Sequence, residues 1–207
     1  MKDGLPIILF ETEQALINWL EENGEKTGLW IRIAKKNSGI LSITYEQAVE
    51  VALCFGWIDG VSNALDEKTW IQRFTPRKPN SKWSKINREK ALGLIADGKM
   101  RPAGITIIEV AKSKGTWETA YDSQKTIEIP EDLQIELDKN PEAAEFFKSP
   151  ESVNRYAILY RLQTALNPEI RTKKLAQFVE MLKRKQKIYN FKFLTKSPVG
   201  GIRGASL

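Results

Sequence analysis

The alternation of apolar and polar residues divides the chain into an N-terminal part with strands and helices and a C-terminal part with helices alone. Residues 5–10 form a short apolar run and residues 29–35 alternate at a period of two, which predicts a strand and then a half-buried strand. Thr12 precedes an apolar stripe at helical spacing, and Thr44 with Gln47 forms a Thr-x-x-Gln capping box. We therefore expect helices to begin after both threonines.

A β-hairpin is expected after the second helix. Gly56 is where that helix should stop, because glycine readily adopts the left-handed conformation that ends helices. Residues 57–62 then leave as an extended segment and residues 70–74 return beside them, with the turn at residues 63–68.

The segment after the hairpin is predicted to be a stiff loop. Pro76 and Pro79 exclude regular strand or helix between them and restrict the backbone. Ser84 is expected to cap the next helix, whose apolar positions are Ile86, Leu92, Leu94 and Ile95. A further helix is expected after Pro102.

Beyond residue 122 no strand pattern appears, and four helices are expected. They start at Pro130, Pro141, Ser149–Pro150 and Pro168. The apolar stripe of the fourth helix, which is flanked by lysines and arginines, is expected to pack within a helical bundle. It consists of Leu175, Phe178, Val179 and Leu182.

This order of elements predicts an α+β fold, with a small mainly antiparallel sheet packed with helices, followed by an all-helical C-terminal region. We expect an α+β domain over residues 1–122, a helical region over residues 123–190 and a flexible tail over residues 191–207.

Composition narrows the chemistry and the compartment. Histidine is absent, which excludes Ser-His and Cys-His nucleophile pairs and the commonest ligand of transition metals. Cys54 is the only cysteine, so we expect a buried inert thiol, no disulfide, no metal site and no cofactor. No apolar run approaches the ~18 residues of a membrane span, and the N-terminus has no secretory pattern. We therefore expect a cytoplasmic protein.

Asp59 is the candidate catalytic residue. It lies between apolar residues and Gly60, so it needs either exposure at a strand end or a partner for its charge. One interpretation is an ion pair with Arg73 or Arg77 that joins the hairpin to the loop. The other is an acid or base that acts on a ligand.

A basic segment with aromatic residues follows Asp59 and predicts an anion-binding surface. The net charge of +6, from 32 basic and 26 acidic residues, is compatible with an anionic partner. Arginine binds phosphate bidentately, aromatic rings stack on bases, and a helix start attracts anions. The candidate anion-binding residues are Arg73, Arg77, Lys78, Lys82, Ser84, Lys85 and Arg88. The candidate pocket-lining residues are Trp57, Phe74 and Trp83. A solvated charged face is the alternative interpretation.

Five segments together resemble the YdeI/OmpD-associated family of bacteriocin-protection proteins. They are residues 52–60, 74–88, 98–104, 111–117 and 165–174, and the resemblance extends over about residues 28–190. It implies protection against antimicrobial peptides and association with an outer-membrane porin, and it assigns no catalytic residues. Some family members are described as periplasmic, whereas no export signal is recognised here.

Three functional hypotheses follow. The leading one is a cytoplasmic stress or antimicrobial-peptide protection protein that binds a phosphate-bearing or nucleic-acid partner through the basic aromatic loop. The second is an enzyme for a small phosphorylated substrate, with Asp59 as acid or base. The third is a protein–protein adaptor that uses the C-terminal helices, which requires an exposed apolar patch on them.

Overall fold

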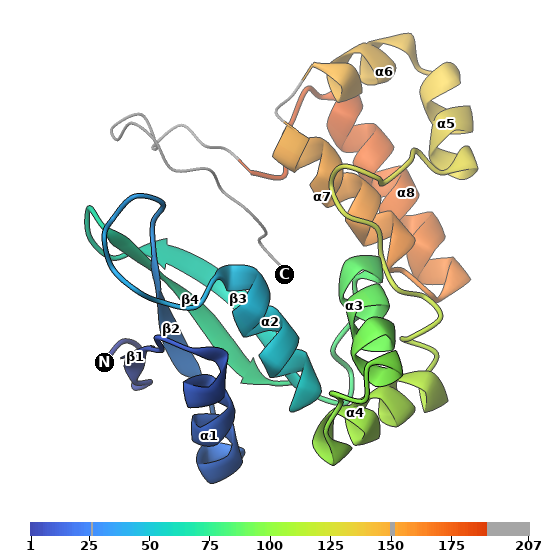
Figure 1. Cartoon of the computed structure of the whole chain (residues 1–207). Helices are drawn as coiled ribbons and strands as arrows, with labels where there is room; N and C mark the ends of the chain where they lie inside the picture. Colours follow the sequence, from blue (N-terminus) through green and yellow to red (C-terminus); the bar gives the residue numbers. More distant parts are fainter. Residues whose placement is uncertain (26, 150–151, 190–207) are drawn as a thin grey trace. The chain divides into compact units, whose positions relative to one another are not determined.

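The computed structural model of the chain describes residues 1–25, 27–149 and 152–189 (Figure 1). These residues divide into two compact units. The first consists of residues 1–82 and 87–118, and the second of residues 83–86 and 119–189. The expected tail at residues 191–207 lies outside the described residues.

The strands all belong to the first unit, as far as the chain is described. The elements up to residue 113 are β1 (Ile7–Leu9), α1 (Glu13–Asn23), β2 (Leu29–Ala34), α2 (Tyr45–Cys54), β3 (Trp57–Ala64), β4 (Thr69–Pro76), α3 (Lys85–Ala96) and α4 (Pro102–Ser113). The later elements are α5 (Glu131–Asp138), α6 (Pro141–Lys148), α7 (Ser152–Gln163) and α8 (Pro168–Lys183).

The four strands form one sheet in the order β1-β2-β4-β3. β1 runs parallel to β2, and the other two pairings are antiparallel. The predicted hairpin is confirmed as β3 and β4, with an irregularity in the register between Asp59 and Ser62. The predicted α+β class, with a mainly antiparallel sheet and a helical C-terminal region, is also confirmed.

The sheet has a helix-covered face and an opposite face. The helix-covered face carries Leu29, Ile31, Trp57 and Phe74, all buried, and the ring of Trp19 on α1 lies 6.1 Å from that of Trp57. Side chains alternate between the faces of a sheet. The opposite face therefore carries Trp30, Ile71 and Arg73, and Leu5 packs there against Trp30 and Ile71.

β2 is more buried than its alternating sequence predicts. Leu29, Trp30 and Ile31 are all buried, on both faces of the sheet. β2 lies between β1 and β4, and the N-terminal segment covers the face that the helices do not. The expectation of a half-buried strand is therefore wrong for its first three residues.

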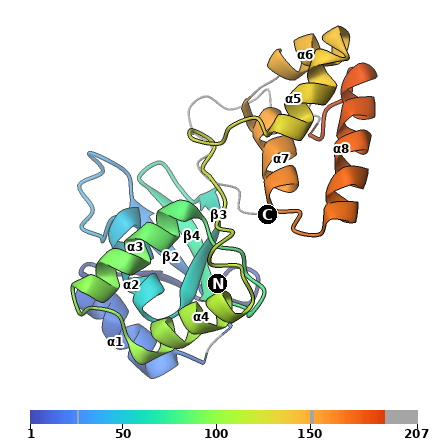
Figure 2. The ribbon, with the colours of Figure 1, turned by 90° about the vertical axis from the view of Figure 1, so that its right-hand side faces the viewer.

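The predicted helix starts are confirmed where a side-chain cap is present. The Thr12 hydroxyl accepts a hydrogen bond from Ala15 N at 3.2 Å, and Thr44 and Gln47 make both bonds of the capping box. Capping satisfies N–H groups that have no partner inside the helix. Figure 2 shows α3 and α4 beside α2, and Arg101 N, at the start of α4, donates to Cys54 O at 3.2 Å.

The apolar positions expected for α3 do not form its buried face. Ile86, Leu92 and Ile95 are 49%, 50% and 38% exposed, whereas Ala91 and Leu94 are buried. Only the stripe that meets a neighbouring element is buried, and three of the four predicted residues lie outside that stripe.

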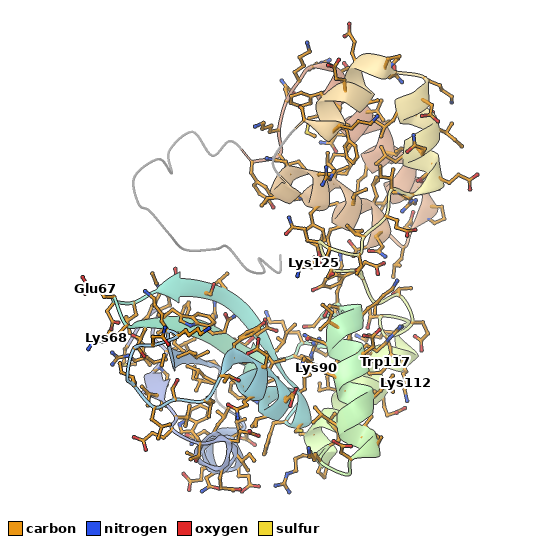
Figure 3. The ribbon with its side chains drawn as sticks, turned by 45° about the horizontal axis from the view of Figure 1, so that its top comes forward. Glu67, Lys68, Lys90, Lys112, Trp117 and Lys125 are labelled. Atoms are coloured by element: carbon orange, nitrogen blue, oxygen red, sulfur yellow. The ribbon has the colours of Figure 1, made fainter. Side chains whose placement is uncertain are left out.

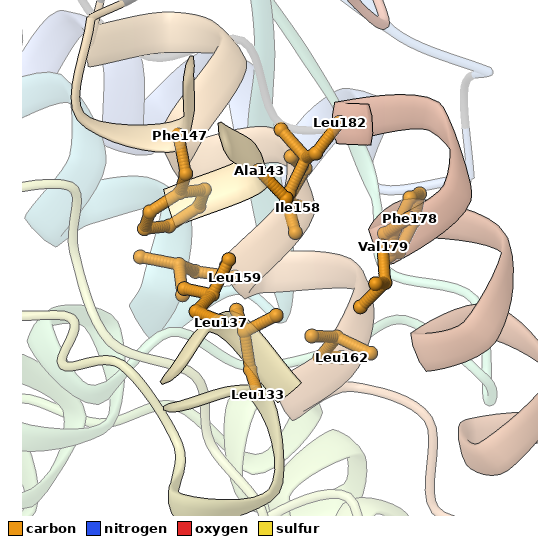
Figure 4. Packing of buried hydrophobic residues seen from close by; sticks show 10 residues of the cluster. All are labelled: Leu133, Leu137, Ala143, Phe147, Ile158, Leu159, Leu162, Phe178, Val179 and Leu182. Carbon is orange, nitrogen blue, oxygen red and sulfur yellow. The ribbon is translucent and has the colours of Figure 1, made fainter. Parts of the chain in front are cut away.

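The second unit is built on one hydrophobic cluster (Figure 4). Its buried members are Leu133, Leu137, Ala143, Phe147, Ile158, Leu159, Leu162, Phe178, Val179 and Leu182. The cluster draws on α5, α6, α7 and α8, so the predicted packing of the α8 stripe in a helical bundle is confirmed. Among the described helices, none combines the length and apolar character that crossing a membrane requires.

Candidate functional site

Asp59 is held by a tyrosine rather than by an arginine. Tyr45, in the first turn of α2, donates its hydroxyl to Asp59 Oδ2 at 2.7 Å. Asp59 lies directly opposite Phe74, and opposite residues of a strand pair share a face of the sheet. Asp59 therefore lies on the helix-covered face, while Arg73, the neighbour of Phe74, lies on the other.

The expected ion pair of Asp59 with Arg73 or Arg77 is wrong: within the described residues, no ion pair involves Asp59. Arg77 is only 4% exposed, and its side chain contacts the loop that it begins. Its backbone N–H donates to Gly56 O at 2.9 Å, and Nη1 donates to Lys82 O at 3.3 Å. Arg77 thus fixes the loop to the end of α2.

The rest of the predicted anion-binding set is divided between the two units. Ser84 and Lys85 belong to the second unit, where Lys85 Nζ lies 2.8 Å from Asp122 Oδ2. In the first unit, Arg88 Nη1 donates to Trp117 O at 3.2 Å. The anion-binding role of these residues stays a prediction, and the structure gives Lys85 and Arg88 partners within the protein.

The three predicted pocket-lining aromatic residues are buried. Trp57, Phe74 and Trp83 are each no more than 2% exposed. None of them lines either of the two pockets described below, and neither does Asp59.

The loop after β4 carries two exposed lysines, and a third lysine, from the end of α4, contacts this loop. We define the lysine loop as residues 77–82 together with Lys114. Its backbone turns at Ser81, whose N–H donates to Lys78 O at 2.9 Å while its hydroxyl accepts from Lys78 N at 3.0 Å. Lys114 Nζ, from the end of α4, donates to Asn80 Oδ1 at 2.9 Å. Lys78, Lys82 and Lys114 are all exposed.

Lys114 was not identified from the sequence. It is 34 residues from Asn80, and no local pattern connects the two positions. The loop itself was predicted from Pro76 and Pro79, but the contribution of α4 to it follows only from the fold.

A pocket of about 430 Å³ lies elsewhere in the first unit, between α1, α2 and the segment that precedes α4. It is lined by Glu13, Ile17, Glu50, Val51, Cys54, Phe55, Leu94, Gly98, Lys99, Met100, Arg101 and Pro102. Cys54 is 7% exposed, so the predicted buried thiol is confirmed, and this burial raises the pKa of the thiol. At the rim, Lys90 pairs with Glu50 at 2.8 Å and Arg101 with Glu21 at 3.3 Å.

A second pocket, of about 320 Å³, lies in the second unit. It is lined by Asp122, Ile127, Glu128, Pro130, Leu159, Gln163 and Arg171. Asp122 Oδ2 accepts from Gln163 Nε2 at 2.6 Å and pairs with Lys85. Arg171 forms a bidentate pair with Asp132, with both N–O distances at 2.8 Å. Asp122 and Arg171 are thus both paired within the protein, and their ion pairs stabilise the wall of the pocket.

Three tyrosines form a cluster beside Asp122. The rings of Tyr121 and Tyr160 meet edge to face at 4.8 Å, and Tyr156 donates its hydroxyl to Asp122 O at 3.1 Å. Burial raises the pKa of Tyr160 to about 12 and also raises the pKa of Tyr156. Both phenols therefore stay protonated hydrogen-bond donors at neutral pH.

The C-terminal helices expose some apolar side chains. Leu166, just before α8, and Ile170, in the first turn of α8, are both at least half exposed. No group of three or more acidic or cysteine side chains suited to a metal ion occurs in the described ranges.

Comparison with known families assigns the two parts of the chain differently. Residues 126–185 match the family described as bacteriocin-protection, YdeI or OmpD-associated. Residues 8–107 match a family described only as a domain of unknown function. No match was found in searches of curated proteins and of solved structures.

The family resemblance noted in the sequence is thus confirmed for the helical region. The expected extension of that resemblance to about residue 28 is not part of this match, because the segments at 52–60 and 74–88 lie in the other family's range.

Proposed function

We propose that the chain acts in protection against antimicrobial peptides by binding an anionic partner, on the premise that residues 126–185 match the YdeI/OmpD-associated bacteriocin-protection family. The binding surface in this proposal is the lysine loop of the first unit. We also propose a cytoplasmic location, because a single cysteine, buried in the structure, suits a reducing compartment.

The single observation that carries the proposal is the contact of Lys114 with Asn80. Through this 2.9 Å hydrogen bond the end of α4 adds a third exposed ammonium group to the loop that carries Lys78 and Lys82. Opposite charges attract, so a loop that carries or contacts three exposed ammonium groups favours an anionic partner.

The loop is stiff enough to keep these charges in place. Pro76 and Pro79 restrict its backbone, the bonds of Ser81 close its turn, and buried Arg77 anchors its start to Gly56. A stiff loop loses little conformational entropy when it binds, so a larger part of the electrostatic attraction appears as affinity.

The partner favoured by this surface is phosphate-bearing, with single-stranded nucleic acid as the simplest example. Lysines contact phosphate as point charges and do not read sequence, so the proposed binding is salt-dependent and tolerant of sequence.

The test uses two double variants with equal net charge. Lys78→Glu with Lys114→Glu reverses two charges of the lysine loop. Lys36→Glu with Lys68→Glu reverses two exposed charges at the other end of the sheet, where Figure 3 shows Lys68 at the tip of the hairpin. Each substitution changes the charge by two, so both variants go from +6 to +2.

Binding of a fluorescein-labelled single-stranded oligonucleotide is measured by anisotropy over a series of KCl concentrations. The lysine-loop variant should bind about tenfold more weakly, and the slope of log K against log salt should become shallower by about 1.4, since about 0.7 counterions are released per contact. The control variant should bind nearly as the wild type does. Equal weakening of both variants would show that only net charge matters and would refute the proposed surface.

A further inference from the structure

Two buried donor groups on the opposite face of the sheet have no acceptor. Trp30 is 1% exposed, and its Nε1 has no hydrogen-bond partner among the described residues. Nε of Arg73 is buried as well and also has no partner there. Buried N–H groups are almost always satisfied, so a pair that is not satisfied indicates an acceptor supplied from outside the chain.

The two residues are direct neighbours across the strands. Trp30 on β2 pairs with Arg73 on β4 in the antiparallel register, so both side chains project from the same face. On the other side of Arg73 lies Gly60 of β3. A Cβ built on Gly60 would lie 3.8 Å from Arg73 Cβ, an ordinary van der Waals contact, so Gly60 and Arg73 are close neighbours on this face.

A second cation, besides Arg73 itself, lies beside this pair. Lys2 Nζ lies 5.1 Å from the centre of the Trp30 ring. None of the ion pairs within the described ranges includes Arg73. Arg32, on the same face and one strand away, shows the usual arrangement, with Nη2 at 2.9 Å from Asp66 Oδ2 and Nε at 3.0 Å from Thr69 Oγ1. Within the described residues, Nε of Arg73 has no such acceptor.

We propose that Trp30 and Arg73 form a site for an oxyanion, a carboxylate or phosphate group, on the face of the sheet opposite the helices. The guanidinium fork binds one edge of the group, the indole N–H donates to a further oxygen, and Lys2 adds a second positive charge. Arg73 is half-buried, so part of its side chain remains accessible to a ligand. The site is separate from the lysine loop and does not depend on the proposed function.

The test follows the indole N–H signal of Trp30 in ¹H–¹⁵N spectra, where the chain's six tryptophans give separate signals. Trp30→Phe identifies the signal by its loss. Sodium phosphate and sodium acetate are added in separate titrations at constant ionic strength, so that the two arms distinguish a phosphate from a carboxylate ligand. The Trp30 signal should shift saturably with at least one of them.

Arg73→Lys keeps the charge but removes the fork, and it should weaken that binding about tenfold. Arg32→Lys is the matched control and should leave the affinity unchanged. If Arg73→Lys does not fold, Arg73→Gln replaces it, with the rise in melting temperature on ligand addition as a second measurement.

A Trp30 signal that is insensitive to tens of millimolar of both anions would overturn the proposal and assign the two donors to ordered water. Equal shifts in the wild type and the Arg73 variant would also overturn it. The Lys78→Glu with Lys114→Glu variant should retain this binding, which separates the outcome from that of the proposed function.

Discussion

The hydroxyl of Tyr45 donates to Asp59 Oδ2 at 2.7 Å and so joins the first turn of α2 to strand β3. The ring of Tyr45 also lies 6.0 Å from that of Trp70 on β4. One side chain thus contacts both strands of the hairpin, and the carboxylate that was the sequence's candidate catalytic residue has a structural partner.

Replacing Tyr45 with phenylalanine should lower the free energy of unfolding by about 1–2 kcal/mol. The change keeps the ring contact but leaves the half-buried carboxylate of Asp59 without its donor. Urea denaturation followed by tryptophan fluorescence measures it. Asp59→Asn, which keeps an acceptor oxygen, serves as the comparison and should cost less. A Tyr45→Phe variant as stable as the wild type would mean that water replaces the hydroxyl at no cost.

Two helical glycines should respond in opposite directions to alanine. A Cβ on Gly104 of α4 would meet Cys54 O at 2.5 Å and Leu53 O at 2.9 Å, and backbone atoms of α2 cannot move aside cheaply. Gly104→Ala should therefore destabilise the first unit by about 2 kcal/mol or more. Gly93, inside α3, has nothing within 4 Å of such a Cβ, so Gly93→Ala should stabilise by about 0.5–1 kcal/mol.

Thermal unfolding of both glycine variants checks this prediction. Both substitutions add a methyl group to a helix, so the gain in helix propensity is about the same in each. The difference between their unfolding free energies therefore reports the close approach of α4 to α2. Similar melting temperatures for the two variants would contradict that close approach.

Alkaline pH should destabilise the second unit through its buried tyrosines. The folded-state pKa of Tyr160 is about 12, above the ordinary value of 10, because burial disfavours the phenolate. The resulting stability is fully present below pH 10 and is lost as the pH rises through about 12. The pKa of Tyr156 is raised for the same reason.

Absorbance of tyrosinate against pH should therefore show Tyr156 and Tyr160 ionising above the ordinary tyrosine pKa of 10. Tyr160→Phe should remove one of the two and make the free energy of unfolding fall less between pH 9 and 11. If the late titration is intact in Tyr160→Phe, the assignment to this cluster is wrong.

Local features of the fold could be predicted from the sequence, and contacts between distant residues could not. The Thr44 capping box and the hairpin depend on residues a few positions apart, and both are confirmed. The partner of Asp59 depends on the register of β3 against β4, which places Phe74 rather than Arg73 opposite it. A shift of one residue would have reversed this outcome.

In the candidate site, too, the local features could be predicted and the contacts between distant residues could not. A stiff basic loop was predicted from its prolines and lysines, whereas the approach of Lys114 to Asn80 depends on how α4 ends beside it. The unsatisfied donors of Trp30 and Arg73 could not be predicted either. Pairing across strands decides which polar groups are buried together, and composition carries no information about that pairing.

The order of the strands also determines how the sheet meets other molecules. β1 and β3 are its two edges. β1 is only three residues long and follows Pro6, and the ladder of β3 is broken between Asp59 and Ser62. Neither edge offers a long, regular row of free N–H and C=O groups, which is how natural proteins prevent strands of two copies from pairing. The broken register of β3 should therefore disfavour pairing of this edge with the sheet of a second copy.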